Sequence, residues 1–351
     1  MKMGENKKFK FDVIIGNPPY QEDDGGASAS ASPIYQYFVT AAKEVNPDRI
    51  VMITPSRWFV GGKGLDEYRN DMLNDRHIEL LCDWLTPQDV FPDTNIRGGV
   101  SFFIWNKEYD NQLSQARVIT CKDNKVVSDV KRCIKFDDVD IFIRDYWGLK
   151  IVEKIKGKLD IDTLANHISS RKPFGLSTTF DKTAAFRKDK SGLHNPILCY
   201  TKGQQKGFIE EDDVVMHSDW INQWKLFTTR ANNIGTELND DNLNTIIGAP
   251  NTVCTETYLV VGADMNLTLE KVKNLQSYMK TKFVRFLHGL SKGSQDATAK
   301  TYRFIPVENF DNSSDIDWKK SISEIDDMLF KKYNLTQQEI DHINNSVKEM
   351  A

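Results

Sequence analysis

The sequence predicts an α/β protein: a sheet of strands and helices first, then a mixed α+β region, then C-terminal helices. Through residue 105, short β-branched apolar runs alternate with segments of helical periodicity. After about residue 145 the segments become shorter and polar turns become frequent. From Trp318 to Met350 helical periodicity returns. Alternating strands and helices are typical of a sheet with crossover connections, and the change of texture indicates a second, less regular domain.

Four strands and two helices are expected in the first part of the chain. The apolar runs FDVIIG, IVMITP, IELLCDW and GVSFFIW predict strands at residues 11–16, 50–55, 78–84 and 99–105. Helical periodicity covers residues 34–45, before the stop signal Asn46-Pro47, and residues 65–73. The stretch from Gln21 to Ser32 is rich in glycine, alanine, serine and acids, so it predicts a mobile loop after the first strand.

The C-terminal tail is expected to form two helices. Apolar residues recur at helical spacing on both sides of Asn334, where the pattern is interrupted. Thr336 stands at the start of the second helix, where its hydroxyl can accept a hydrogen bond from a free backbone N–H group. The tail therefore predicts a helix pair with a capped second member.

Length and composition exclude several classes of protein. With 351 residues, of which 40% are hydrophobic and 27% charged, the chain is typical of a soluble globular protein of two domains. It contains no apolar run of about 18 residues, which argues against a membrane span. The cysteines lie far apart, as expected of reduced thiols in a cytoplasmic protein: Cys82, Cys121, Cys133, Cys199 and Cys254. A net charge of −4 argues against a protein that coats nucleic acid but leaves room for a local basic face.

The motif Asn17-Pro18-Pro19-Tyr20 directly follows the first expected strand. Open α/β sheets bind ligands outside the carboxyl ends of their strands, and the motif lies at such an end. The two prolines fix the backbone and carry no N–H group, so their carbonyls are rigid acceptors. Asn17 adds a side-chain acceptor, and Tyr20 adds an aromatic face. The motif indicates a site that grips an exocyclic amino group on a flat ring; a plain Pro-Pro turn is the alternative.

The stretch from Phe11 to Lys107 resembles the N6-adenine DNA methyltransferases of the NPPY class. The runs IVMITPSRWFVGGKGLDEYRNDML and VFPDTNIRGGVSFFIWNK resemble the following strand and helix and the later hairpin of that family. The ending WKKSISEIDDMLFKKYNLTQQEIDHI resembles the C-terminal helices of restriction–modification methylases whose target-recognition domain follows the catalytic one. The resemblance implies a partial Rossmann-like methyltransferase sheet. It also implies three parts: residues 1–145 as the C-terminal part of the catalytic domain, 146–310 as the target-recognition domain, and 311–351 as C-terminal helices.

The resemblance also assigns catalytic roles to Asn17, Pro18, Pro19 and Tyr20. Asn17 and the carbonyl of Pro18 would hold the amino group of adenine, and Tyr20 would stack on the base after it has been flipped out of the duplex. The family has a second aromatic wall in this pocket. Phe136 and Phe142 are candidates for it, although core packing explains either residue more simply.

The cofactor implied by the resemblance is S-adenosyl-L-methionine. Only eleven residues precede Asp12, too few for the glycine-rich strand–turn–helix that binds this cofactor. The glycines at 61–64, 262 and 289 are poor substitutes, since loop geometry explains them more simply. We therefore expect that the cofactor-binding half is absent from this chain, which would be inactive without such a half or a partner subunit. The free edge of the strand at 11–16 is expected to pair with another chain or with rearranged N-terminal residues.

Three clusters of basic and amide side chains in the second domain are candidates for contact with double-stranded DNA. Arginine and lysine reach phosphates or guanine edges, and glutamine can pair with adenine edges. Solvated loops are the alternative for any one cluster. The residues that we select are Arg171, Lys172, Lys202, Gln204, Gln205, Lys206, Lys292, Ser294, Gln295 and Arg303. The loop with Lys292, Ser294 and Gln295 is the strongest candidate because its sequence is the most loop-like.

The leading hypothesis is thus a site-specific DNA adenine-N6 methyltransferase component of a restriction–modification system. Two other functions remain open. A non-catalytic DNA-specificity module would use the recognition domain alone, and a protein glutamine N-methyltransferase would hold a side-chain amide with the same motif. No metal site is expected, because His167, His194, His217 and His288 stand at no metal-ligand spacing. No nuclease motif stands out.

Overall fold

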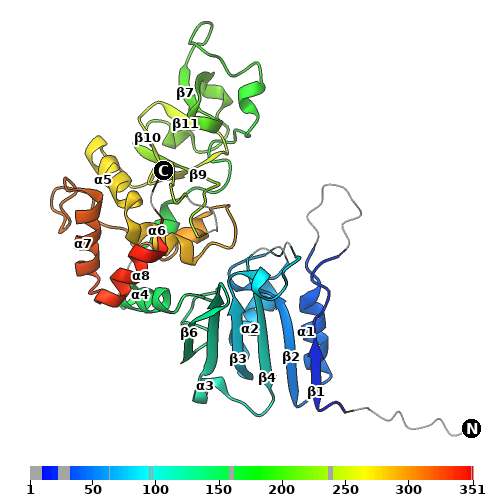
Figure 1. Cartoon of the computed structure of the whole chain (residues 1–351). Coiled ribbons are helices and arrows are strands. Elements are labelled where there is room, and N and C mark those ends of the chain that lie inside the picture. Colours follow the sequence, from blue (N-terminus) through cyan, green and yellow to red (C-terminus); the bar gives the residue numbers. More distant parts are fainter. Residues whose placement is uncertain are drawn as a thin grey trace, which may run out of the picture. The chain divides into compact units, whose positions relative to one another are not determined.

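The computed structural model describes residues 10–22, 32–62, 64–94, 96, 98–157, 162–235, 240–348 and 350. The chain divides into two compact units, Met1–Tyr146 and Trp147–Ala351, each with a hydrophobic core of its own (Figure 1). Among the helices in these ranges, none has both the length and the apolar character needed to cross a membrane. The loop expected at residues 21–32 falls largely on residues 23–31, which lie outside the described ranges.

A six-stranded mixed sheet forms the first unit, with the strand order β1-β2-β4-β3-β5-β6. The strands are β1 (Val13–Gly16), β2 (Arg49–Pro55), β3 (Ile78–Trp84), β4 (Val100–Asn106), β5 (Ala116–Lys122) and β6 (Lys125–Arg132). The four strands expected from the sequence are confirmed, as is the α/β fold class. The β5–β6 hairpin was not expected. Strand β4 is antiparallel to both of its neighbours, so the β3–β4 connection needs no crossover helix.

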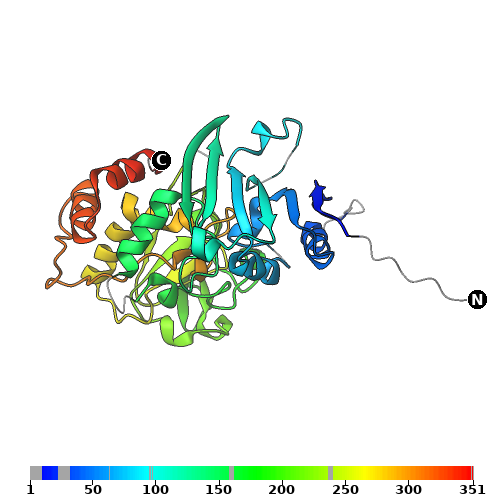
Figure 2. The same ribbon diagram turned by 90° about the horizontal axis from the view of Figure 1, so that it is seen from below.

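Two helices, α1 (Tyr35–Glu44) and α2 (Asp66–Asn74), cover one face of this sheet (Figures 1 and 2). Both helices were expected from their periodicity. In α1, Tyr35, Val39 and Ala42 recur at helical spacing and are buried, so they form one apolar stripe. The stripe packs with buried side chains of α2 and of β2, β3 and β4 in a single core. Side chains on the opposite face of β1 are exposed: Val13 by 49% and Ile15 by 78%.

One edge of the sheet gathers the Asn-Pro-Pro-Tyr motif and two neighbouring turns. Strands β1 and β2 are parallel, so their carboxyl ends lie at the same edge, the upper one in Figure 1. Because β4 runs antiparallel between β2 and β3, the start of β4 and the end of β3 lie at this edge too. The motif after β1, the turn after β2 and the β3–β4 loop therefore meet there. We call this the carboxyl edge.

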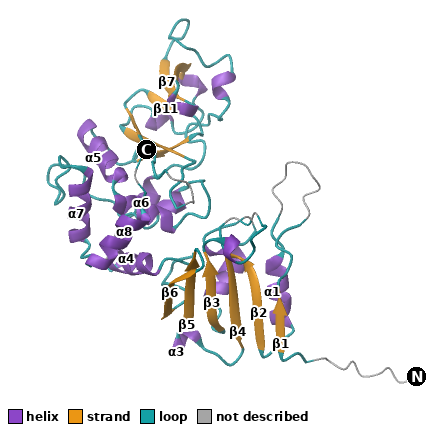
Figure 3. Ribbon diagram, in the orientation of Figure 1, coloured by secondary structure: helices purple, strands orange, loops and turns teal. Residues whose placement is uncertain are grey.

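The second unit contains two three-stranded sheets and most of the helices (Figure 3). One sheet has the order β10-β9-β12 and the other β11-β7-β8. The strands are β7 (Pro196–Tyr200), β8 (Lys206–Glu210), β9 (Lys225–Thr229), β10 (Ile246–Gly248), β11 (Thr252–Cys254) and β12 (Tyr258–Val261). The helices are α4 (Tyr146–Lys156), α5 (Leu269–Lys280), α6 (Lys282–Leu290), α7 (Ile322–Lys332) and α8 (Gln337–Ser346).

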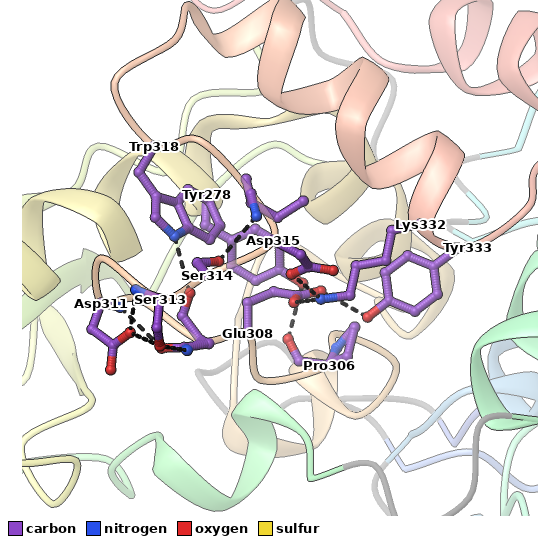
Figure 4. Close-up of polar contacts among 12 residues, drawn as sticks. Tyr278, Pro306, Glu308, Asp311, Ser313, Ser314, Asp315, Trp318, Lys332 and Tyr333 are labelled. Atoms are coloured by element: carbon purple, nitrogen blue, oxygen red, sulfur yellow. Dashed lines mark hydrogen bonds and ion pairs between the residues drawn. The ribbon is translucent and has the colours of Figure 1, made fainter.

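The tail forms the expected helix pair, α7 and α8. Thr336 caps α8: its hydroxyl accepts from the backbone N–H of Glu339, and the Glu339 carboxylate accepts from the N–H of Thr336. Before α7, the buried carboxylate of Glu308 accepts from the Lys332 ammonium at 2.6 Å and from the Tyr333 hydroxyl at 2.7 Å (Figure 4). These two bonds fasten the end of α7 to the preceding segment.

Candidate functional site

The motif leaves β1 with the Asn17 side chain accessible. Asn17 and Pro19 are exposed, Pro18 is buried and Tyr20 is half-buried. Pro18 anchors the turn in the protein, because its ring is covered and its φ angle is fixed. The Asn17 amide, directly beyond the end of β1, remains open to a ligand. The turn thus combines a fixed backbone with an accessible side-chain acceptor.

Tyr20 is held by its backbone and by the packing of its ring. Its carbonyl accepts from the N–H of Ile34 at 3.3 Å, and the next residue, Gln21, forms an isolated bridge with Pro33. The ring packs against the core of the first unit. Burial raises the pKa of Tyr20 to about 12, so the phenol is neutral at physiological pH. Its hydroxyl is buried without a hydrogen-bond partner among the described residues, which leaves the ring as the functional part.

A second aromatic ring lies beside Tyr20, and the sequence did not single it out. Phe91 stands in the β3–β4 loop with its ring centroid 6.4 Å from that of Tyr20 and an angle of 68° between the ring planes. Its N–H bonds to the carbonyl of Pro87 at 2.9 Å, which orders this part of the loop. Of the two aromatics expected from the sequence, Phe142 is buried in the core against Phe59, while Phe136 is half-buried. The useful signal would have been an aromatic residue in a loop at the carboxyl edge.

An ion-pair cluster orders the rest of the carboxyl edge. Asp83, near the end of β3, is 1% exposed and accepts from two nitrogens of Arg144, at 2.6 and 2.8 Å. The Ser56 hydroxyl donates to the same carboxylate at 2.6 Å. Arg144 also donates to the carbonyl of Gly98 at 2.8 Å. The next residue, Gly99, has a φ angle of +94°, and a Cβ there would lie 2.2 Å from the Arg144 guanidinium. Only glycine fits this close approach.

Comparison with known proteins connects this edge to a family. Residues 2–91 match the Eco57I restriction-modification methylase family. A protein of Mycoplasma pneumoniae (strain ATCC 29342 / M129 / Subtype 1), described as an uncharacterized adenine-specific methylase, is 35% identical over 107 residues. That match covers 30% of this chain and 25% of the relative, so the chain spans about a quarter of the relative's length.

Two solved structures are similar over most of the chain. One is the type IIL restriction-modification enzyme MmeI in complex with DNA, with a TM-score of 0.48, 9% identity and coverage of 95% of this chain and 56% of that one. The other is the type IIG restriction endonuclease BpuSI, with a TM-score of 0.36, 11% identity and coverage of 95% of this chain and 53% of that one.

The stretch that matches the Eco57I family model contains most of the carboxyl edge. Asn17, Tyr20, Ser56, Asp83 and Phe91 all lie within residues 2–91. Arg144 and the selected basic residues of the second unit lie beyond it. The family match and the site geometry therefore coincide at the Asn-Pro-Pro-Tyr motif.

Three of the glycines that were considered for the cofactor, Gly62, Gly262 and Gly289, lie close to neighbouring groups in this structure. A Cβ on Gly62 would lie 2.6 Å from the Leu65 side chain, and one on Gly262 would lie 3.0 Å from the Leu267 side chain. A Cβ on Gly235 would lie 3.1 Å from the backbone of Gly289, so these two glycines allow a close backbone contact. The described residues at these positions therefore do not fit a cradle for S-adenosylmethionine. Nor does any group of three acidic, histidine or cysteine side chains in the described ranges suit a metal ion.

The three basic clusters, far apart in sequence, converge on one turn of the second unit, Thr255–Tyr258, between β11 and β12. We call it the 255–258 turn. In the first cluster, Arg171 donates to the buried carboxylate of Glu256 at 3.1 Å, and the Lys172 ammonium lies 4.0 Å away. Burial would raise the pKa of Glu256, but hydrogen bonds from Thr178 and Arg171 lower it below its usual value. Glu256 therefore stays ionised and holds this cluster in place.

The second and third clusters are bonded to the same turn. The Tyr258 hydroxyl accepts from the N–H of Gln204 at 3.1 Å and donates to the carbonyl of Thr201 at 3.1 Å. Residues 202–206 form an exposed tip between β7 and β8. The third cluster is linked to the turn through Arg230, which lies outside the cluster. The N–H of Arg230 donates to the Thr257 carbonyl at 2.9 Å, and the Arg230 side chain pairs with Asp296 in the cluster's loop at 2.9 Å. The turn thus positions all three polar loops.

Lys292 differs from the expectation of an exposed DNA contact. It is 7% exposed, and its ammonium donates to the Asn232 carbonyl at 2.8 Å, to the Asn232 side chain and to the Gln295 carbonyl at 3.3 Å. Its ammonium fastens the 291–297 loop to Asn232, in addition to the backbone bonds from Asn232 N–H to the Gln295 carbonyl and from Ala297 N–H to the Arg230 carbonyl. Ser294 and Gln295 are exposed at the tip, and Arg303 is half-buried. Lys292 is a support of this loop.

The buried ammonium makes stability depend on pH. Burial lowers the pKa of Lys292 from 10.5 to about 7, although Asp241 and Asp296 oppose the shift. The folded state thus binds the proton less tightly than the unfolded chain, and the contribution of this group to stability rises with pH above 7. Between pH 7 and pH 9 the gain is about 2 kcal/mol.

Lys292→Met is expected to lack this gain, which urea unfolding at the two pH values measures. Lys225, also buried with a pKa lowered to about 7, is present in both proteins and cancels in the comparison. An equal change of stability with pH in the wild type and the variant would contradict the assignment.

Proposed function

We propose that this chain is a component of a site-specific DNA adenine-N6 methyltransferase of a restriction–modification system. The observation that carries the proposal is the motif at the end of β1, in which an exposed Asn17 amide stands beside the buried Pro18 and the ring of Tyr20. This edge also lies within the segment of the Eco57I restriction-modification methylase family.

In this proposal the target adenine leaves the duplex and enters the carboxyl edge. The side-chain oxygen of Asn17 and the carbonyl of Pro18 accept the two hydrogens of the exocyclic amino group. Holding both N–H bonds favours a pyramidal nitrogen, whose lone pair can then attack an electrophilic methyl group. The ring of Tyr20 supplies a stacking surface, and Phe91 supplies the second aromatic wall beside it.

Target recognition is proposed for the loops around the 255–258 turn. Exposed lysines and arginines there would bind phosphates, and exposed glutamines would read base edges. The residues concerned are Arg171, Lys172, Lys202, Gln204, Gln205, Lys206, Ser294, Gln295 and Arg303. Because one turn holds the loops together, they can act on one stretch of DNA.

A cofactor-binding half is proposed to join the sheet at β1. When that half is bound, it supplies S-adenosylmethionine as the methyl donor. Within the described residues, β1 is an edge strand whose single neighbour is the parallel strand β2. Parallel strands are typically buried on both faces, yet Val13 and Ile15 are exposed. An exposed parallel edge with apolar side chains fits the addition of a further parallel strand.

A substitution on the exposed edge strand β1 should weaken association with the cofactor-binding half without affecting the folding of the chain. Ile15→Glu is expected to weaken binding of the cofactor-binding half at least tenfold, because a charge would replace an apolar side chain in the new interface. Val127→Glu, at an exposed apolar position on β6 at the other edge of the sheet, serves as the matched control. The product of the reading frame upstream of this one is tested as the cofactor-binding half. Co-purification with it measures the binding of each variant. Equal binding by the two variants would place the interface elsewhere.

The function itself is tested by co-expressing the chain with the upstream reading frame in a host that lacks adenine methylation. Sequencing that detects N6-methyladenine should reveal one methylated motif, and the chain alone should give none.

Tight S-adenosylmethionine binding by the chain alone, measured by calorimetry, would contradict the proposed division of labour. DNA binding without methylation in the co-expressed pair would favour a specificity module. Methylation of a glutamine peptide in place of DNA would favour the protein methyltransferase.

A further inference from the structure

Arg57 lies at the carboxyl edge immediately after β2. In the parallel β1–β2 pair, Gly16, the last residue of β1, stands opposite Met52, and β2 continues to Pro55 before the turn that carries Arg57. Arg57 is exposed, whereas its neighbours Ser56 and Trp58 are buried. The chain therefore exposes one cation at the carboxyl edge, the edge of the sheet at which the motif with Asn17 and Tyr20 follows β1.

Two observations relate the Arg57 side chain to segments next to Tyr20, one electrostatic and one geometric. Its charge acts on Tyr35, opposing the rise in the pKa of that phenol caused by burial. Tyr35 follows Ile34, whose N–H is bonded to the Tyr20 carbonyl. On the other side, a Cβ on Gly98 would lie 3.6 Å from Cγ of Arg57, so the stem of Arg57 runs along the loop that also carries Phe91.

Arg144, the neighbouring arginine at this edge, is bound to other groups of the protein, whereas Arg57 has no such partner among the described residues. Arg144 is bound bidentately to Asp83 and also to the Gly98 carbonyl. No hydrogen bond or ion pair joins Arg57 to another side chain in the described part of the chain. An exposed guanidinium without a partner can bind a phosphate through two N–H groups at once.

We propose that Arg57 binds the phosphate of the flipped target nucleotide and so positions its adenine against Tyr20. The inference rests on the proposed function, since it takes the carboxyl edge to be the adenine pocket. A flipped base remains attached to its sugar and phosphate, so its pocket must have an anionic group at its rim. Arg57 supplies the matching charge within the family segment, whereas the basic loops of the second unit read the duplex around the target.

The test compares two small ligands that differ only in the phosphate. Binding of deoxyadenosine and of deoxyadenosine 5′-monophosphate to the full chain is measured by ligand-observed NMR. The wild type should bind the monophosphate about threefold to tenfold more tightly than the nucleoside. Arg57→Gln should remove this preference and leave nucleoside binding unchanged, and Arg57→Lys should retain part of it.

Arg49→Gln is the matched control. Arg49 is an exposed arginine at the first position of the same strand, at the opposite edge of the sheet. Its substitution should leave the phosphate preference intact. Loss of the preference in Arg49→Gln, retention of it in Arg57→Gln, or an equal loss of both ligands in Arg57→Gln would overturn the assignment.

Tyr20→Ala separates the inference from the function on which it rests. It should weaken both ligands by a similar factor, because each carries the same base. If Tyr20→Ala changed neither affinity while Arg57→Gln still removed the phosphate preference, the adenine pocket would be wrong and the anion site at Arg57 would stand.

Discussion

Arg144→Met is expected to lower the free energy of unfolding of the first unit by about 3–5 kcal/mol. The substitution removes both guanidinium bonds from Asp83, whose side chain is 1% exposed, and leaves its charge with the hydrogen bond from the Ser56 hydroxyl. A buried carboxylate without its cation is costly because it has lost its hydration as well as its ion pair. Urea unfolding monitored by tryptophan fluorescence measures the change.

Arg117→Met provides the matched control on the same sheet. Arg117 also binds an aspartate through two nitrogens, at 2.9 and 2.7 Å from Asp129, but this pair is exposed. Its loss should change stability far less than the loss of Arg144. Adding Asp83→Asn to Arg144→Met should restore part of the stability, because the uncompensated charge is then gone. Equal effects of the two arginine substitutions would contradict the role given to burial.

Asn17→Ala is expected to reduce methyl transfer by the assembled enzyme by about 100-fold to 1,000-fold. The magnitude is that of removing one preorganised hydrogen-bonding group that stabilises the developing transition state. The alanine variant should still fold, since the Asn17 side chain is exposed. Methyl incorporation into DNA by the chain together with the cofactor-binding half measures the effect as a fall in kcat.

Two other substitutions sharpen this result. Tyr20→Phe should retain nearly full activity, because the Tyr20 hydroxyl has no hydrogen-bond partner in the described structure and the ring is kept. Asn70→Ala, at an exposed asparagine on α2, controls for a general effect of removing a surface amide. If Asn17→Ala retained methyl transfer within tenfold of the wild type, the proposed acceptor role would be wrong.

The sequence predicted the elements of the first unit better than their pairing. The runs at 50–55 and 78–84 became β2 and β3 almost to the residue, because β-branched and apolar side chains favour strands locally. The antiparallel position of β4 depends on which strands meet in space, and periodicity carries no such information. The β5–β6 hairpin was missed because β6 has an exposed, mostly polar pattern that resembles a loop.

At the site, the motif could be found from the sequence but its surroundings could not. Phe91 stands about 70 residues from Tyr20 in the chain, and a single aromatic residue in a loop has no signal of its own. Lys292 looked like a surface residue because lysine is rarely buried. Its burial depends on acceptors at Asn232, which adjoin it only after folding. Long-range contacts of this kind shape the candidate site and leave no local pattern.

The 255–258 turn has a consequence for how new DNA specificities could arise. Glu256, Thr257 and Tyr258 hold three separate loops, each through different atoms. The exposed residues of one loop can therefore change without disturbing the anchors of the other two. Randomising Gln204 and Gln205, or Ser294 and Gln295, while keeping the turn intact gives libraries in which altered recognition is separated from loss of folding.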